Sequence, residues 1–573
     1  MVYSEIKQLG GVPSLFINGE AVVPMSYITY FSERGAYKEF ASAGYSIFSL
    51  VCNFGGQSFN PVTQIRAMAP GIFDHPDHDD FSGFDSALER IVSECPDAKI
   101  FPRVNLSMPL HWEQAHPEEC NESGVEGRPA RFCFSSDLWR KDAGEYLRKL
   151  IRHIENGPFS DHIIGYQLAA GSTEEWVGLD EQGSIGKAAY KKFKERYPED
   201  QSEYSFYRYL SEITAETIIY FAKLVKEYTG GNLIVGTFYG YLFEVPRRSS
   251  CHHAIRKILN APEIDFICSP GSYITRLTPE LGWSVMLPVD SLKLQKKLYF
   301  FEFDTRTFLT RHVNECRPGS CLPGTYTHPI WSGHNRQLTI GQIRMNFAQQ
   351  LSCGSASWWF DMWGKWFDDK ELMKELESYH KIGKECLKAP DRTSVAEVAV
   401  FIDECTYAGD PESSKNGWEV NGNRKKLTQT GIPLAFYEIG DFEKVIESYR
   451  FVFFFSDLPT KKLNEAVAEC NRRKITMMHV YPGNPLPSVA IIRKMLQKAG
   501  VHIYCDREYA VYVNKFMAAV HAAEDGKCRL TFPGRRYITP LLPPGKTCYT
   551  SEIELNLCAG DTALFRFESD GRL

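Results

Sequence analysis

The chain has 573 residues, 43% of them hydrophobic and 24% charged, with a formal net charge of −6. A chain of this length is too long to fold around a single hydrophobic core, so we expect two to four globular domains. The weak negative charge provides no electrostatic footprint for nucleic acid or for an anionic membrane, and both are excluded as partners.

Sixteen cysteines are scattered along the chain without a C-x-x-C pair, which predicts free thiols and no metal site. The N-terminal stretch has no apolar segment of the kind that a secretory signal carries, and no apolar run has the length of a membrane span. We therefore expect a cytoplasmic protein, or a periplasmic one if a signal peptide has been removed.

Between about residues 10 and 390, short apolar runs alternate with amphipathic stretches. The runs that predict strands are Val22–Tyr30, Tyr45–Asn53, Lys99–Leu106, Ile163–Ala169, Asn232–Tyr239, Ile264–Ser269, Leu298–Phe303 and Ser355–Phe360. Continuous apolar runs are typical of parallel strands that are covered on both faces. Helical patterns follow the runs, among them Phe84–Cys95, Arg140–Glu155, Ile185–Thr229 and Glu371–Leu387. Eight such repeats predict an α/β fold, a (β/α)8 TIM barrel over residues 1–390.

Two smaller units follow Pro390. Residues 391–507 contain the strand-like runs Val395–Ile402, Phe451–Phe455, Ile475–Val480 and Val501–Tyr504, separated by helical stretches. This alternation predicts a small open α/β (Rossmann-like) domain. Because it has neither G-x-G-x-x-G nor a nucleophile turn, we expect it to serve oligomerisation. Residues 508–573 are short strand-like runs with turn residues such as Asp525-Gly526 between them, which predicts a small C-terminal β-sandwich.

Two of the predicted barrel strands run into glutamates in polar, aromatic-rich segments. The fourth strand runs into G-S-T-E-E-W (Gly171–Trp176), and the seventh runs into E-F-D-T-R-T (Glu302–Thr307). The carboxyl ends of parallel barrel strands meet at one rim, so these glutamates are expected to lie near one another. Paired carboxylates at one rim are what cleavage of a glycosidic bond requires.

Other strand ends and the loops behind them supply hydrogen-bonding and stacking side chains. We expect the substrate to contact Arg103, Asn105, Tyr239, Arg306, Trp358, Asp361 and Trp363. No phosphate cradle, Ser-His-Asp set or clustered metal site is found at the strand ends, so no cofactor and no metal are predicted. Bulky residues beside glycines in the loops, with a long loop from Phe308 to about Asn335, predict a pocket rather than an open groove.

The order of barrel, small α/β domain and terminal β-domain, with glutamates on strands four and seven, resembles the family 42 β-galactosidases of clan A, the large barrel clan of retaining glycoside hydrolases. The strand ends are most similar to family 42-related proteins that carry G-x-T-x-E-W and E-x-D-T-R-T at these positions. On that pattern Glu175 is the acid/base and Glu302 is the nucleophile. The chain departs from the family in lacking its usual Asn-Glu pair on strand four and the four-cysteine zinc site of some members, which leaves the identity of the sugar open.

The resemblance implies a retaining, exo-acting glycosidase that releases non-reducing terminal β-linked sugars, of β-galactosidase or β-mannosidase type. Glu302 would attack the anomeric carbon and Glu175 would protonate the leaving oxygen, with the two carboxyl groups about 5–5.5 Å apart. Arg103 and Asn105 would orient Glu302 and a substrate hydroxyl. In the family the α/β domain mediates trimer formation, so the resemblance also implies a homotrimer.

Three alternatives remain open. Glu174 could be the acid/base in place of Glu175, because adjacent residues of a regular strand point in opposite directions and both cannot enter the cleft. The chain could also be a carbohydrate-binding barrel without catalysis, as the missing Asn-Glu pair permits. A metal-dependent barrel hydrolase would need histidines clustered at strand ends, whereas the candidates fall in loops or helices, namely His111, His252, His253 and His312.

Overall fold

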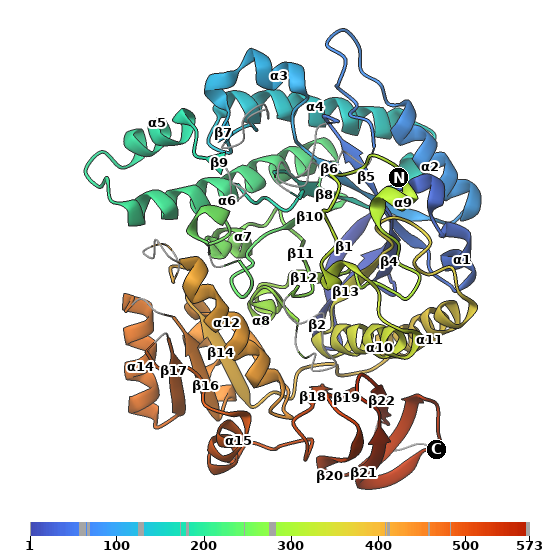
Figure 1. The fold of residues 1–573 in the computed structure, drawn as a ribbon, viewed down its shortest axis with the longest axis vertical. Helices are drawn as coiled ribbons and strands as arrows, with labels where there is room; N and C mark the ends of the chain where they lie inside the picture. The colour runs from blue at the N-terminus through green and yellow to red at the C-terminus, as the bar shows by residue number, and fades with distance from the viewer. Residues whose placement is uncertain are drawn as a thin grey trace.

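The computed structural model describes residues 2–56, 65, 69–123, 131–171, 173–178, 183–245, 247–273, 282, 284–406, 408, 413–456, 459–481 and 483–568. Eight parallel strands close a barrel, with helices on its outside (Figure 1). In barrel order the strands are β4 (Met25–Ile28), β5 (Ile47–Asn53), β6 (Lys99–Asn105), β8 (Gly165–Ala169), β10 (Ile234–Phe238), β11 (Phe266–Pro270), β12 (Leu298–Phe303) and β13 (Ala356–Phe360). The predicted TIM barrel is confirmed, with each strand at one of the eight apolar runs.

The barrel helices begin and end at residues suited to those positions. The helices are α1 (Tyr37–Ser42), α2 (Ser82–Glu94), α4 (Asp137–Asn156), α5 (Lys187–Arg196), α6 (Glu203–Tyr228), α7 (Ile255–Asn260), α8 (Val289–Leu294), α10 (Arg336–Cys353) and α11 (Lys370–Leu387). Ser136, Ser202 and Asn335 cap α4, α6 and α10 by accepting a hydrogen bond from a backbone N–H of the first turn. No helix of the described ranges is long and apolar enough to cross a membrane.

A three-stranded antiparallel sheet, which was not predicted, precedes the barrel. It consists of β1 (Ser4–Leu9), β2 (Val12–Ile17) and β3 (Glu20–Ala21). The Ser4 hydroxyl donates to the carbonyl of Ile164 and accepts from the amide of Ile234 at 3.0 Å. These partners lie at the amino ends of β8 and β10. The sheet is therefore joined to the end of the barrel opposite the rim where catalytic side chains are expected.

The second domain is a four-stranded parallel sheet in the order β15-β14-β16-β17, which confirms the predicted open α/β fold. Its strands are β14 (Val398–Ile402), β15 (Ala435–Glu438), β16 (Phe451–Phe455) and β17 (Thr476–Val480), and its longer helices are α12 (Ser413–Thr428), α14 (Lys461–Arg473) and α15 (Val489–Lys498). Strand β15 and helix α12 were not predicted, and the predicted strand Val501–Tyr504 is not a strand. β15 has only four residues, and the amides of Phe436 and Glu438 donate to Asp290 and Ser291 of the barrel helix α8.

A buried arginine also joins the α/β domain to the barrel rim. Arg424 of α12 donates to the carboxylate of Glu244 at 2.9 Å and to the hydroxyl of Ser272 at 2.7 Å, and it also donates to the carbonyl of Val285. These three partners lie in the segments that follow β10 and β11. The α/β domain therefore holds two loops at the carboxyl end of the barrel.

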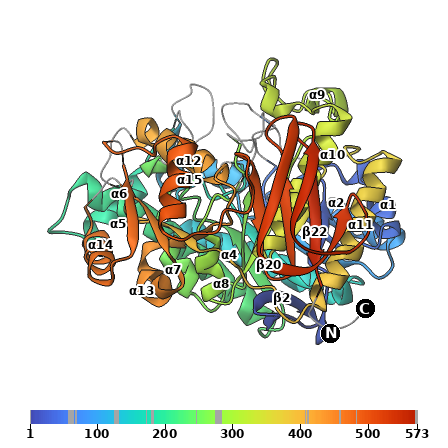
Figure 2. The same ribbon diagram turned by 90° about the horizontal axis from the view of Figure 1, so that it is seen from below.

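The C-terminal domain is one five-stranded antiparallel sheet in the order β18-β19-β22-β20-β21, seen in red in Figure 2. Its strands are β18 (Ala510–Val513), β19 (Met517–His521), β20 (Gly526–Leu542), β21 (Cys548–Leu557) and β22 (Thr562–Phe567). In place of the second sheet of the predicted sandwich, the barrel helix α10 packs against this sheet. The Thr562 hydroxyl donates to the carbonyl of Gly341 at 2.7 Å. A Cβ on Gly341 would lie 1.8 Å from the carbonyl oxygen of Gly560, so this approach requires glycine.

Candidate active site

Glu302 lies near the end of β12, where two donors from other strands hold its carboxylate. A terminal nitrogen of Arg103, on β6, lies 2.5 Å from its Oε2, and the indole nitrogen of Trp358, on β13, lies 2.9 Å from the same oxygen. The residue is only 4% exposed. Burial raises the pKa of Glu302, whereas the charge of Arg103 and the hydrogen bonds from Arg103 and Trp358 act in the opposite direction and favour the ionised carboxyl group.

Arg103 is itself fixed on several sides. Its Nε donates to the side chain of Gln167 on β8 at 3.1 Å. Its guanidinium carbon lies 4.8, 5.2 and 5.1 Å from the ring centroids of three aromatic residues, Phe238, Trp358 and Phe360. Burial opposes the charge on Arg103, but nearby acidic groups, Glu302 first among them, outweigh burial and raise its pKa. The guanidinium is therefore a permanent positive charge among the catalytic candidates.

The two adjacent glutamates after strand β8 lie in a loop with unusual backbone angles. β8 ends at Ala169, and φ is +57°, +68° and +60° at Thr173, Glu174 and Trp176. Non-glycine residues rarely adopt such angles, which cost of order 1–3 kcal/mol each and persist where the surrounding structure holds them. Because the segment is not an extended strand, the alternation of side chains between opposite faces does not apply. Both Glu174 and Glu175 come close enough to Glu302 for its charge to raise their pKa values.

Glu175 is held by two neutral hydroxyl groups. Tyr241, which follows β10, donates to its Oε1 at 2.9 Å, and Thr173 donates to its Oε2 at 2.9 Å. Burial and the charge of Glu302 raise the pKa of Glu175 to about 8. Among the described residues no cation lies within ion-pair distance of this carboxyl group. Its surroundings therefore favour the protonated form at neutral pH, as a general acid requires.

His252 holds the backbone of both Glu175 and Tyr241 through its two ring nitrogens. Its Nε2 lies 2.9 Å from the backbone carbonyl oxygen of Glu175, and its Nδ1 accepts from the backbone N–H of Tyr241 at 3.4 Å. This pairing assigns the hydrogen to Nε2. Burial, with a contribution from His253, lowers the pKa of His252 to about 3, so the ring is neutral.

Glu174 is completely buried and lies on the other side of Arg103. The Tyr30 hydroxyl donates to its Oε2 at 3.3 Å, and the side-chain amide of Asn105 donates to its Oε1 at 3.5 Å. A terminal nitrogen of Arg103 lies 3.9 Å from Oε2. Burial, opposed by the Arg103 charge and assisted by the Glu302 charge, raises the pKa of Glu174 to about 7. The carboxyl groups of Glu302 and Glu174 therefore flank the Arg103 guanidinium, and that of Glu175 lies close enough to Glu302 to sense its charge.

The remaining predicted substrate contacts fall into two groups. Trp363 stacks on Tyr30 with ring centroids 6.0 Å apart, which places it next to the carboxyl cluster. Tyr239, Asp361 and Arg306 have protein partners instead. The Tyr239 hydroxyl donates to the carbonyl of Ser211 at 2.8 Å. Asp361 accepts from the Tyr27 hydroxyl and from the amides of Lys365 and Trp366, and Arg306 pairs with Asp304 at 2.8 Å. These contacts brace the rim, and direct contact of these three residues with substrate stays a prediction.

Gln167 and His252 are among the residues around the carboxyl groups that the sequence does not predict. Gln167 lies within the apolar run that predicts the fourth strand. A glutamine buried in such a strand requires a hydrogen-bond partner for its amide, and this is the signal that could have identified it as a site residue. His252 was considered only as a metal ligand. Its link to Glu175 joins residues 77 positions apart, and no local pattern carries that information.

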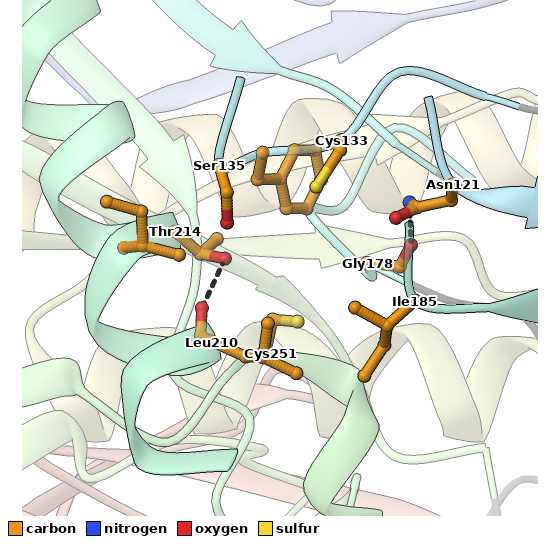
Figure 3. Close-up of a pocket in the computed structure, with 10 residues that line it drawn as sticks. Asn121, Cys133, Ser135, Gly178, Ile185, Leu210, Thr214 and Cys251 are labelled. Atoms are coloured by element: carbon orange, nitrogen blue, oxygen red, sulfur yellow. Dashed lines mark hydrogen bonds between the residues drawn. The ribbon is translucent and has the colours of Figure 1, made fainter. Parts of the chain in front are cut away.

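Glu302 itself lines a cavity of about 20 Å³, together with Asp304 and Asn346 among others, and two further cavities are not lined by the three glutamates. One of about 340 Å³ is lined by Tyr30, Asn53, Phe84 and Arg317 among others, and its volume is within the range of small-molecule sites. The other, shown in Figure 3, has about 20 Å³, room for about one water molecule. In the smaller cavity Gly178 faces Cys251, and a Cβ on Gly178 would lie 2.5 Å from the sulfur. The smaller cavity is too small for a sugar, and it lies beside Gly178, three residues after Glu175.

The described residues contain no group of three or more His, Cys, Asp or Glu side chains that could hold a metal ion. All sixteen cysteines are free. The ionisable groups at the rim are the three glutamates with Arg103, the Asp304–Arg306 pair and Asp361, and hydroxyl, amide and aromatic groups surround them.

Comparison with known proteins identifies relatives by structure only. No family model and no curated protein matches the sequence. The β-galactosidase of the psychrophilic Marinomonas ef1 superposes with a TM-score of 0.61 at 10% identity, covering 95% of this chain and 100% of that chain. A catalytic mutant of Gan42B, a GH42 β-galactosidase from G. stearothermophilus, gives 0.59 at 10% identity, covering 95% and 98%. The α-L-fucosidase isoenzyme 2 of Paenibacillus thiaminolyticus gives 0.59 at 9% identity, covering 96% and 100%. These likenesses establish that the chain has the fold of such enzymes over almost its whole length.

Proposed function

We propose that the chain is a retaining, exo-acting glycoside hydrolase that removes non-reducing terminal β-linked sugars, of β-galactosidase or β-mannosidase type. One observation carries the proposal: Glu302, held by Arg103, shares the barrel rim with Glu175, which has only neutral hydroxyl partners on its carboxyl oxygens. The first environment favours a carboxylate and the second favours a carboxylic acid. This difference between two neighbouring carboxyl groups is what the two roles in glycosidic cleavage demand.

In the first step the Glu302 carboxylate attacks the anomeric carbon while the Glu175 carboxyl group gives its proton to the glycosidic oxygen. The bond from the anomeric carbon to that oxygen breaks, and an ester between the sugar and Glu302 forms. The departing alcohol carries the proton away, so Glu175 is left as a carboxylate. Retention requires the two carboxyl groups to lie about 5–5.5 Å apart, which stays a prediction.

In the second step the Glu175 carboxylate takes a proton from a water molecule as the water oxygen attacks the anomeric carbon. The ester bond to Glu302 breaks, the sugar leaves with its original anomeric configuration, and both carboxyl groups return to their starting states. Arg103 and the Trp358 indole stabilise the charge that returns to Glu302. Tyr241 and His252 keep the Glu175 side chain and backbone in place for both proton transfers.

A panel of nitrophenyl glycosides tests the reaction class. It contains the β-D-galactoside, the β-D-mannoside and, because an α-L-fucosidase shares the fold, the α-L-fucoside. We expect nitrophenol release from at least one of them, and proton NMR of the fresh product should show the configuration of the substrate. Binding of a sugar without release from any glycoside would favour the carbohydrate-binding barrel instead, and an inverted product would exclude the two-step mechanism.

Exo action is proposed from the residues around the rim. The loop after β12 packs over it, with Tyr326 and Trp331 in contact and Tyr326 next to Trp363. We expect these aromatic side chains to close the rim into a pocket that admits only the end of one sugar chain. Digestion of an oligosaccharide should therefore release monosaccharides from the start, and early internal fragments would mean an open groove.

We expect the assembled protein to be a homotrimer, in which the α/β domain supplies the contacts between subunits. The resemblance of the sequence to family 42 enzymes motivates this expectation, and the α/β domain carries exposed apolar side chains, Tyr481 and Ile491, at 40% and 49% exposure. Light scattering coupled to size exclusion should return three times the 65.3 kDa of one chain. A mass of one chain at all concentrations would contradict the trimer and leave the catalytic proposal intact.

A further inference from the structure

The proposed reaction uses two carboxyl groups, but the site contains three. Glu174 has no exposed surface, so it does not offer its carboxyl group to a substrate. It lies in the loop that has positive φ angles at three non-glycine residues, which means that the chain bears a conformational cost to place it there. A buried ionisable group at such a position, with no step assigned to it, calls for a role within the site.

The contacts of Glu174 point to Arg103. The guanidinium directs one terminal nitrogen to Glu302 at 2.5 Å and the other to Glu174 at 3.9 Å. The groups that face Glu174 are Arg103 and Asn105 from β6, Tyr30 from the segment after β4 and Glu302 from β12. Arg103 is the only cation among them, so it is shared between two acids at unequal distances.

The net charge of the cluster decides which of the two acids keeps its negative charge beside Arg103. With all three carboxyl groups ionised, the buried cluster would hold three negative charges and one positive charge, which is strongly unfavourable away from water. Burial raises the pKa of Glu302 too, but of the three acids Glu302 is the one in direct contact with Arg103, and this contact makes it best placed to keep its negative charge. The pKa values of Glu174 and Glu175, raised mainly by burial to about 7 and about 8, agree with protons on both acids below neutral pH.

We infer that Glu174 is a positioning residue that acts on the nucleophile through Arg103. As a neutral acid it leaves the guanidinium to Glu302, and as a carboxylate it draws the guanidinium toward itself and weakens the support of Glu302. The inference rests on the proposed function for its effect on rate. It predicts that activity falls on the basic side in two stages, first as Glu174 loses its proton and then as Glu175 loses the proton that the leaving group needs.

The Glu174→Gln variant tests this role, because glutamine has the shape of the neutral acid and cannot ionise. Profiles of kcat/KM against pH should be measured from pH 5 to pH 9.5 with an activated nitrophenyl glycoside. We expect the ratio of variant to wild type to rise about threefold to tenfold between pH 6 and pH 8.5. The basic limb of the variant should be a single step near the pKa of Glu175, about 8.

Asp304→Asn is the matched control. Asp304 pairs with Arg306, and its charge raises the pKa values of Glu302 and Glu175. Removing it should lower both pKa values and move the basic limb to lower pH, opposite to Glu174→Gln. Two results would overturn the inference: a Glu174→Gln profile that keeps the wild-type shape, or one that shifts as Asp304→Asn does. A loss confined to poor leaving groups and restored by azide would instead make Glu174 the acid/base, and would also overturn it.

A measurement without turnover separates this inference from the proposed function. In protein labelled with ¹³C at the glutamate carboxyl carbon, the Glu302 signal, identified from its loss in Glu302→Gln, should respond in two stages as pH is raised through about 7 and about 8. The first stage should vanish in Glu174→Gln. If the Glu302 signal does not change as Glu174 loses its proton, the inference is overturned. If the Glu302 signal responds to the Glu174 titration but the protein cleaves no glycoside, the proposed hydrolase function is contradicted and this inference is not.

Discussion

Glu302→Gln is expected to lower kcat by a factor of about 10⁴ or more, because an amide has nearly the shape of the carboxylate but cannot form the ester with the sugar. The glutamine oxygen can still accept from Trp358, so the hydrogen-bonded frame is largely kept. The measurement is turnover of the best substrate of the nitrophenyl panel, with circular dichroism to confirm folding. Retention of more than about a hundredth of wild-type kcat would show that Glu302 is not the nucleophile.

The same variant should also be less stable. It removes the anion in contact with Arg103, and breaking a buried ion pair costs about 3–5 kcal/mol of unfolding free energy. Glu174, 3.9 Å from the other terminal nitrogen, can replace part of that charge, so we expect the lower end of this range. Glu155→Gln, an exposed change on α4, is the control that should alter neither turnover nor unfolding.

The barrel could be predicted because its strands are covered on both faces. A strand such as β12, Leu298–Phe303, is buried along its whole length and therefore appears in the sequence as a continuous apolar run with clear ends. The N-terminal sheet escaped prediction for the opposite reason. β1, S-E-I-K-Q-L, has only two apolar residues, Ile6 and Leu9, and they do not follow the two-residue period of a strand. Its hydrogen-bond partners at the barrel end come from residues more than 150 positions away.

In the candidate site, the residue types could be predicted but their contacts could not. Glu302 was identifiable because it ends an apolar run on a strand. The arrangement of Glu174 and Glu175 depends on left-handed backbone angles at residues that are not glycine, and no sequence rule predicts these angles. The rule that adjacent side chains point in opposite directions holds for a regular strand, and it does not apply here because the segment is a loop.

Contacts across the barrel explain why the three carboxyl groups can differ in behaviour although they are chemically identical. Glu302 is set apart by a guanidinium that four separate side chains hold, Gln167 and three aromatic rings. Glu175 is set apart by having hydroxyl partners only. A sequence gives the identity of each acid, whereas its protonation state follows from neighbours that the fold brings together.

Glu175→Ala is expected to slow substrates with poor leaving groups by about 10²–10⁴-fold and activated aryl glycosides much less, because only the former need a proton on the departing oxygen. With activated substrates the second step should then become limiting, since no carboxylate remains to deprotonate water. Azide needs no deprotonation. It should therefore restore turnover of the aryl glycoside and yield a glycosyl azide with the configuration of the substrate.

The comparison with Glu174→Ala decides between the two adjacent acids. Both variants remove one carboxyl group from the same loop, so a general disturbance of the loop would affect all substrates alike in both. Dependence on the leaving group together with rescue by azide marks the acid/base alone. If Glu174→Ala has this pattern and Glu175→Ala does not, the acid is Glu174. The hydroxyl contacts of Tyr241 and Thr173 would then support a neighbour of the acid and not the acid itself.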